Sequence, residues 1–221
     1  HIVNITASED ITINTNASIN VNGLGYDGGK YPANGYGPAG GFGEYGGVSD
    51  SGGGGAHCGD GGTAGGAGGT AYGDVSNLIT MGAGGGSPYV TNRYGGDGGG
   101  LMILAASGTF YIDGSLFANG TSGDDIGSYD GGGGAGGGIR LTSGSLSGTP
   151  SAIEANGGTG VVSGGGGGGG CIQAFYSANT MSTSSLVVGG GTGGENGEDG
   201  AVNFMQENEA PTASIGTASQ I

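Results

Sequence analysis

Basic residues are almost absent from this chain. Lys30, Arg93 and Arg140 are the only three in 221 residues, against 18 Asp and Glu, and the formal net charge is −15. Proteins that bind nucleic acids or anionic membranes neutralise phosphates with Lys and Arg. The composition therefore argues against both kinds of partner.

The sequence also lacks the patterns of several common architectures. No apolar run approaches the roughly 18 residues of a membrane-spanning helix, so membrane insertion is not expected. No segment has a convincing helical periodicity, which predicts essentially no helix. Glycine is abundant, at 64 residues, but with only 5 prolines and no strict three-residue period the chain is not collagen.

The apolar residues are few but clustered. A low apolar content with high net charge is typical of disordered chains. Here the apolar residues form short blocks such as Leu101–Leu104, Phe110–Ile112 and Leu116–Phe117, separated by glycine tracts. Such clustering allows a narrow core to form.

An internal repeat gives the strongest prediction of fold. Three stretches, 101–120, 139–158 and 171–191, each begin with an apolar strand directly after a glycine tract, pass through a Ser/Gly/Asn turn and make a second strand. The first two end in Ala-Asn-Gly. Residues 11–23, ending in Val-Asn-Gly, look like the second half of such a unit, and residues 201–206 look like the first strand of another.

Within each unit the apolar residues alternate with a period of two, as in strands with one buried face. A unit of this size cannot bury its own apolar face, whereas stacked units can. We therefore predict an all-β, parallel β-solenoid-like domain over residues 1–206, with repeats from about 11 to 206 and a long Gly/Tyr-rich insertion at about 24–100. Residues 207–221 are expected to be a linker or a strand donated to a neighbouring subunit.

The glycine tracts, such as 164–170, recur at the same place in each unit and run directly into the strands. Extended glycine segments can pack side by side as polyproline-II-like helices, because the missing side chains allow close approach. This predicts ordered tracts, with a flexible linker as the alternative.

The alternation of Ala-Asn-Gly strands with polyglycine resembles the glycine-rich β-solenoid domains of large prokaryotic surface proteins. Over residues 11–206 it is also similar, in composition and repeat layout, to the polyglycine-II tail-fibre adhesins of T-even-like bacteriophages. The resemblance implies an extracellular protein. We expect a structural role, as a subunit of a filament or sheath or as a stalk domain, because open solenoid ends must be capped or stacked. Its partners would be further copies or further domains of the same protein.

The alternative role is adhesion to a glycan or surface receptor. Aromatic side chains of the 24–100 region would then form the binding surface, since tyrosines are typical of recognition surfaces. These residues are Tyr26, Tyr31, Tyr36, Phe42, Tyr45, Tyr72, Tyr89 and Tyr94.

Other residues that could form a disulfide, carry a glycan or bind an ion are scattered along the chain. Cys58 and Cys171 are either a disulfide or two free thiols, and His57 is expected to be an exposed loop residue. Glycosylation sequons occur at Asn4, Asn16 and Asn119. No cofactor is expected other than calcium, for which Asp124, Asp125, Asp130 and Asp199 are candidate ligands, with solvated turn carboxylates as the alternative. No catalytic constellation is apparent, so we do not expect an enzyme.

Overall fold

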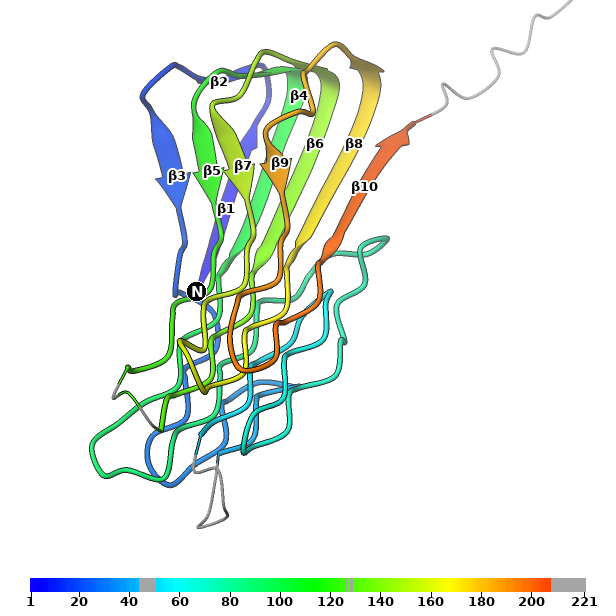
Figure 1. Cartoon of the computed structure of the whole chain (residues 1–221). Coiled ribbons are helices and arrows are strands. Elements are labelled where there is room, and N and C mark those ends of the chain that lie inside the picture. Colours follow the sequence, from blue (N-terminus) through cyan, green and yellow to red (C-terminus); the bar gives the residue numbers. More distant parts are fainter. Residues whose placement is uncertain (44–50, 126, 128, 208–221) are drawn as a thin grey trace, which may run out of the picture.

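The computed structural model describes residues 1–43, 51–125, 127 and 129–207. This part of the chain contains two parallel β-sheets and no helix, which confirms the all-β prediction (Figure 1). The strands form a larger and a smaller sheet.

The strands of the larger sheet are β1 Ile2–Ala7, β2 Ile11–Ile13, β4 Leu101–Ile112, β6 Gly138–Ser147, β8 Cys171–Asn179 and β10 Ala201–Gln206. They have the order β1-β4-β6-β8-β10, and β2 pairs with the distal part of β4. The strands of the smaller sheet are β3 Ser18–Asn20, β5 Ser115–Phe117, β7 Ala152–Glu154 and β9 Leu186–Val187. The smaller sheet has the order β3-β5-β7-β9.

The strands β4, β6, β8 and β10 each begin at the end of a glycine-rich tract, and their first residues lie in register with one another and with the start of β1. Ile2, Leu101, Gly138, Cys171 and Ala201 form one such row across the sheet. The predicted strand starts at 101, 139, 171 and 201 agree with these bounds to within one residue. The first strand, β1, was not part of the predicted repeat, which began at about residue 11.

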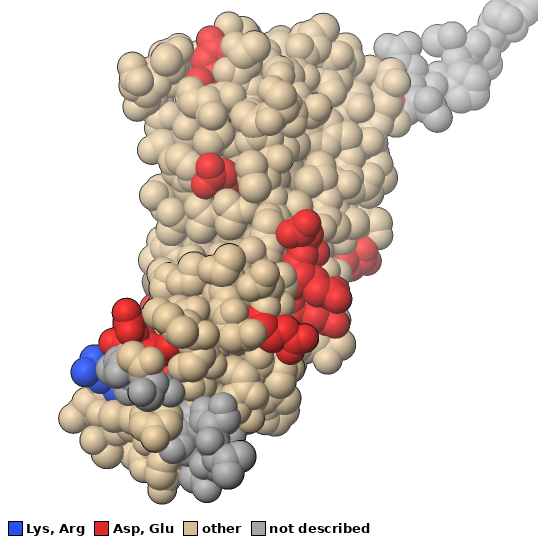
Figure 2. All heavy atoms as spheres, in the orientation of Figure 1, with Lys and Arg blue, Asp and Glu red and all other residues tan. Residues whose placement is uncertain are grey.

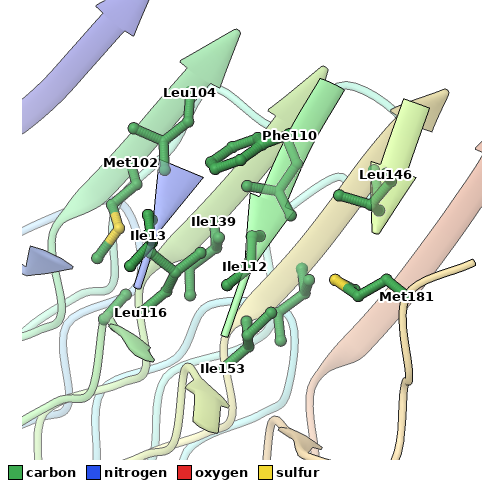
Figure 3. Close-up of a cluster of buried hydrophobic side chains, with 14 of the residues drawn as sticks. Ile13, Met102, Leu104, Phe110, Ile112, Leu116, Ile139, Leu146, Ile153 and Met181 are labelled. Atoms are coloured by element: carbon green, nitrogen blue, oxygen red, sulfur yellow. The ribbon is translucent and has the colours of Figure 1, made fainter. Parts of the chain in front are cut away.

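The core lies between the two sheets. Every second residue of the long strands faces it, and the inward-facing side chains of the central strands β4 and β6 are almost completely buried (Figure 3). The smaller sheet closes the core with one apolar residue per strand. Those residues are Ile19, Leu116, Ile153 and Leu186.

The Ser/Gly/Asn turn that the sequence predicts within each unit does not interrupt the first strand of the 101–120 unit at Ser107 and Gly108. Strand β4 runs without a break from Leu101 to Ile112, and the pairing with β6 shifts register between Ala106 and Thr109. Such an irregularity bends a strand without ending it. The chain reverses later, at Asp113 and Gly114, before β5.

The recurring Asn of the Val-Asn-Gly and Ala-Asn-Gly motifs forms a ladder beyond the smaller sheet. The Asn119 N–H donates to Asn22 Oδ1 at 2.7 Å, and the Asn156 N–H donates to Asn119 Oδ1 at 2.7 Å. The Gly189 N–H then donates to Asn156 Oδ1 at 2.8 Å. The ladder explains the repeat, because each Asn side chain binds the backbone of the next unit.

The glycine segments fill the other half of the molecule, beyond the ends of the strands (lower half of Figure 1). Their backbone groups bind one another with a period of three residues. The N–H groups of Gly165 and Gly168 donate to Gly52 and Gly55, whereas those of Gly166 and Gly169 donate to Glu195 and Glu198. Those of Gly167 and Gly170 donate to Gly158 and Ala155. A single tract therefore binds three neighbouring segments in rotation.

The same rotation occurs in a second tract. The N–H groups of Gly133 and Gly136 donate to Gly165 and Gly168, and those of Gly132 and Ala135 donate to Gly86 and Ala83. The close packing requires glycine: a Cβ placed on Gly54 would lie 1.9 Å from the carbonyl oxygen of Gly166. The tracts are thus ordered by mutual hydrogen bonds and are not flexible linkers.

Candidate functional site

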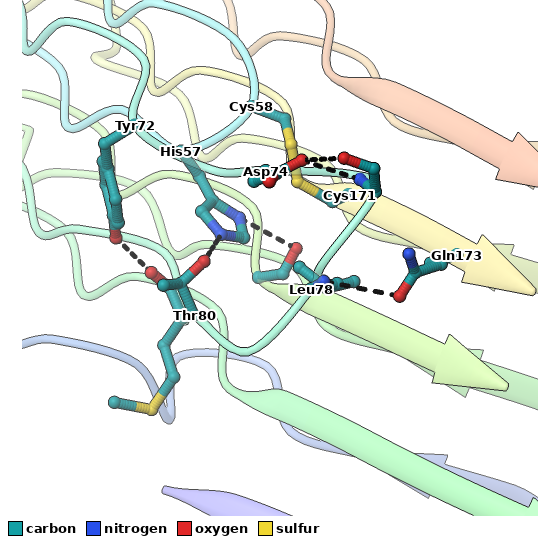
Figure 4. The surroundings of a disulfide bond; sticks show 11 residues. His57, Cys58, Tyr72, Asp74, Leu78, Thr80, Cys171 and Gln173 are labelled. Atoms are coloured by element: carbon teal, nitrogen blue, oxygen red, sulfur yellow. Dashed lines mark hydrogen bonds between the residues drawn. A yellow bond between two sulfur atoms is a disulfide. The ribbon is translucent and has the colours of Figure 1, made fainter.

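A disulfide joins the glycine-rich half to the larger sheet. Cys58 lies in a glycine segment and Cys171 is the first residue of β8, and their Cα atoms are 5.7 Å apart (Figure 4). The sequence left this pairing open. The bond lies beside a second, smaller apolar cluster in which Leu78, from a segment crossing the outer face of the sheet, is fully buried. The disulfide therefore secures the contact between the two halves.

His57 is not the exposed loop residue that the sequence predicted. Its side chain is buried, with Nδ1 3.1 Å from the Gly137 carbonyl oxygen and Nε2 2.9 Å from Thr80 Oγ1 (Figure 4). The Tyr72 ring packs against it with 5.4 Å between ring centroids. Desolvation lowers the pKa of His57 to about 4 despite hydrogen bonds to backbone carbonyls. The prediction failed because surrounding glycines let the backbone enclose the ring.

The four candidate calcium ligands do not converge. In the described part of the chain no group of three or more His, Cys, Asp or Glu is arranged to hold a metal ion. Asp130 is buried, and its carboxylate accepts hydrogen bonds from the Ser163 N–H and hydroxyl, each at 3.0 Å. Asp124 lies 4.0 Å from Arg93, and Asp199 accepts the Gly190 N–H at 3.0 Å. Asp125 is exposed and accepts the Gly127 N–H at 3.1 Å.

The three sequons lie in different surroundings. Asn4 is exposed on the edge strand β1, and Asn16 is exposed in a turn with a φ of 66°. Asn119 belongs to the asparagine ladder, and its Nδ2 donates to Glu154 Oε2 at 3.2 Å. A glycan on Asn119 would have to displace these contacts.

The aromatic residues of the 24–100 region separate into several groups. Tyr31 and Tyr89 contact each other edge to face, with centroids 5.5 Å apart. Tyr72 is half-buried, and its hydroxyl donates to the Met81 carbonyl. Tyr45 lies outside the described residues. Tyr26 is half-buried, whereas Tyr36, Phe42 and Tyr94 are exposed.

Two of these exposed tyrosines, Tyr36 and Tyr94, line one pocket of about 350 Å³, together with Asp27, Gly28, Lys30 and Asp97. A separate pocket of about 400 Å³ includes Phe42 and Tyr72 in its lining. Sequence analysis identified the tyrosines as candidate binding residues. It did not predict that two carboxylates and a lysine lie beside them. The lining residues come from two segments, 27–36 and 94–97, which are far apart in sequence and share no motif.

Two of the three basic residues lie at this end of the molecule. Lys30 pairs with Tyr94 in an isolated antiparallel bridge, and its Nζ lies 5.1 Å from the centre of the Tyr94 ring. The adjacent Arg93 lies 4.0 Å from Asp124. On the face shown in Figure 2, basic atoms occur only at one corner of the glycine-rich half, beside carboxylates. The third basic residue, Arg140, lies over the Phe175 ring on the larger sheet.

The outer strands of the larger sheet, β1 and β10, expose apolar side chains whose equivalents on the inner strands are buried. In one row, Ile5 is 41% exposed, whereas Leu104 and Leu141 are 1% and 0% exposed. In the next inward-facing row, Val202 of β10 is 46% exposed, whereas Ile172 is 0% exposed. Both ends of the stack therefore present apolar side chains and a strand edge.

No protein-family model, no curated protein and no solved structure matches this chain. Among the described residues, no helix is long and apolar enough to cross a membrane.

Proposed function

We propose that this chain is an extracellular structural protein, a filament or sheath subunit or a stalk domain, that assembles by stacking the ends of its sheets. In this interpretation the two sheets are the walls of a parallel β-solenoid and the glycine half is a polyglycine-II-like bundle. The three-residue rotation of hydrogen-bond partners supports the second part, because such a helix has three residues per turn. The in-register parallel rows support the first.

The observation that carries the proposal concerns the cross-strand rows of apolar side chains. Their members are buried on the inner strands but exposed at both ends of the stack. A strand edge offers unpaired N–H and C=O groups to another chain, and exposed apolar side chains add a hydrophobic contribution. Strands β1 and β10 have six residues each, and both pair in register with their inner neighbours. The pairing of β10 with β1 of a second copy would repeat the pairing already present inside the chain.

Such stacking is head to tail. The β10 end of one copy meets the β1 end of the next, so each added copy leaves the same two ends free. Contacts of this kind give open filaments unless the rotation between copies closes a ring. In the proposed geometry, Ile5 of the second copy would lie next to Phe204, the last member of its row.

An extracellular location is part of the proposal. Disulfides persist mainly in oxidising environments, and the Cys58–Cys171 bond crosses 113 residues of sequence. A sparse apolar core benefits from such a cross-link.

The test uses two variants that each block one end. Ile5→Lys places a charge at the β1 end, and Val202→Lys places one at the β10 end. We expect the unmodified chain to form concentration-dependent oligomers in size-exclusion chromatography with light scattering, and filaments in electron microscopy. Each variant alone should be monomeric, but an equimolar mixture should form a dimer through the two intact ends.

The matched control is Val162→Lys, because Val162 is 74% exposed and lies in a turn of the glycine-rich half. It should assemble like the unmodified chain. Thermal melting of each variant separates loss of assembly from loss of folding. A chain that stays monomeric at all concentrations, or variants that assemble normally, would contradict the proposal.

A second candidate function is recognition of a surface glycan or receptor at the tyrosine-bearing end. The specific observation that favours it is the pocket in which Tyr36 and Tyr94 meet charged side chains. Recognition and stacking use different parts of the molecule, so one does not exclude the other.

A further inference from the structure

The walls of the Tyr36/Tyr94 pocket are held by the glycine hydrogen-bond network. The Gly28 N–H donates to Asp97 Oδ1 at 2.7 Å and so ties the segment around residue 28 to the one around residue 97. The Tyr36 N–H donates to the Asp27 carbonyl oxygen at 3.0 Å. Because these contacts fix backbone positions, the pocket is formed before any ligand arrives, which reduces the entropic cost of binding.

The same segments also form backbone hydrogen bonds with other glycine segments and with each other, which adds to the rigidity of the pocket. The Gly29 N–H donates to the Gly85 carbonyl oxygen at 2.8 Å, and the Gly95 N–H donates to the Gly29 carbonyl oxygen at 3.0 Å. The Gly98 N–H donates to the Tyr26 carbonyl oxygen at 2.9 Å. The pocket thus lies on a hydrogen-bonded scaffold and not on a free loop.

The side chains of the pocket combine three kinds of chemistry. Tyr36, 58% exposed, and Tyr94, 40% exposed, present aromatic surface to the solvent. Asp27 and Asp97 supply carboxylate oxygens that accept hydrogen bonds, and Lys30 supplies donors. Lys30 lies over the Tyr94 ring, so Tyr36 offers the more accessible aromatic surface.

We propose that this pocket binds a neutral saccharide, an inference that rests on recognition as the second candidate function. A sugar ring has an apolar C–H face that packs on an aromatic ring, and hydroxyl groups that donate to carboxylates and accept from lysine. Two carboxylates and one lysine leave the pocket with an excess of negative charge. The chain as a whole carries −15, so uronic acids, sialic acids and phosphorylated sugars are repelled.

The test is titration of the whole chain with neutral oligosaccharides of glucose, galactose, mannose and N-acetylglucosamine, alongside glucuronate and sialyllactose. Ligand-observed saturation-transfer NMR detects weak binding, and calorimetry measures its strength. We expect at least one neutral sugar to bind and the acidic sugars to show no saturation transfer. Tyr36→Ala and Asp27→Asn should each weaken that binding at least about tenfold.

The matched control is Tyr111→Ala, because Tyr111 is also 40% exposed but lies at the far end of β4. It should bind the neutral sugar like the unmodified chain. Binding that survives Tyr36→Ala overturns the assignment of the pocket. Preference for an acidic sugar that is lost in Tyr36→Ala overturns the ligand class while leaving recognition at this end in place.

Absence of binding to every sugar overturns the proposal and removes the support for glycan recognition. None of these outcomes alters the expected stacking of the sheet ends, which is measured separately by light scattering. Failure of the pocket and failure of assembly are therefore distinguishable.

Discussion

The surroundings of the buried His57 imidazole stabilise only the neutral form of the ring. The Gly137 carbonyl oxygen can only accept, so Nδ1 carries the hydrogen, and the Thr80 hydroxyl can then donate to Nε2. Protonation would remove the acceptor and place a charge in a desolvated site. This explains why the folded pKa, about 4, lies below the ordinary value of 6.5.

The lowered pKa of His57 predicts a loss of stability in mild acid. Well above pH 6.5 the ring is neutral in both the folded and the unfolded chain and contributes no pH dependence. As the pH falls through 6.5, the unfolded chain gains a proton that the folded chain does not, so the free energy of unfolding decreases until about pH 4. We expect a loss of about 2 kcal/mol between about pH 7 and pH 5, measured by denaturant unfolding.

The matched variant is His57→Gln, whose amide can still donate to Gly137 and accept from Thr80 but does not titrate. It should be less stable at neutral pH and should lose most of the slope between pH 7 and pH 5. An NMR titration that gives His57 an ordinary pKa, or a slope that persists in the variant, would contradict the assignment.

At the scale of the element, the glycine tract depends on backbone contact that no other residue permits. In Gly54→Ala the new Cβ would lie 1.9 Å from the Gly166 carbonyl oxygen and 2.6 Å from its carbon. Both are backbone atoms in the hydrogen-bonded bundle, so neither can move alone. We expect this variant to lose more than about 3 kcal/mol of stability or to fail to fold.

Gly189→Ala provides the comparison. A Cβ on Gly189 meets its nearest atom, Asn156 Oδ1, at an ordinary 3.5 Å. Alanine also restricts the unfolded chain more than glycine does, so this variant should be neutral or more stable by up to about 1 kcal/mol. Equal stabilities for the two variants in denaturant unfolding would show that the tracts are not tightly packed.

The strands β4, β6, β8 and β10 could be predicted because their apolar blocks follow glycine-rich tracts and their apolar residues alternate. The strand β1 could not, since it precedes the first glycine tract and has no such marker. The Ala-Asn-Gly motif could be recognised as a repeat, but its role as a hydrogen-bond ladder required the register between units. Local sequence therefore predicted elements better than the contacts between them.

The candidate pocket was only partly predictable for a related reason. The bundle is held by backbone hydrogen bonds between glycines, and glycines do not differ from one another in sequence. Nothing in residues 24–100 therefore specifies which segment lies beside which, or that Asp27 and Asp97 lie in the same pocket as Tyr36. The burial of His57 could not be predicted for the same reason, because the glycines around it do not show which segments enclose the ring.

At the scale of the whole molecule, charge and stacking oppose each other. Each copy carries a net charge of −15, so the ends of two copies approach against electrostatic repulsion. The apolar rows at Ile5 and Val202 provide an attraction that does not depend on charge. Salt screens repulsion over a Debye length that falls from about 30 Å at 0.01 M to about 10 Å at 0.1 M.

We therefore expect self-association to strengthen as sodium chloride is raised from about 0.01 M to about 0.3 M, because screening removes repulsion and leaves the hydrophobic contacts in place. Light scattering at a fixed protein concentration measures the change in mean mass. The Val202→Lys variant should remain monomeric throughout, which separates end-to-end stacking from non-specific salting out. Association that weakens with salt would mean that ion pairs, and not the apolar rows, join the copies.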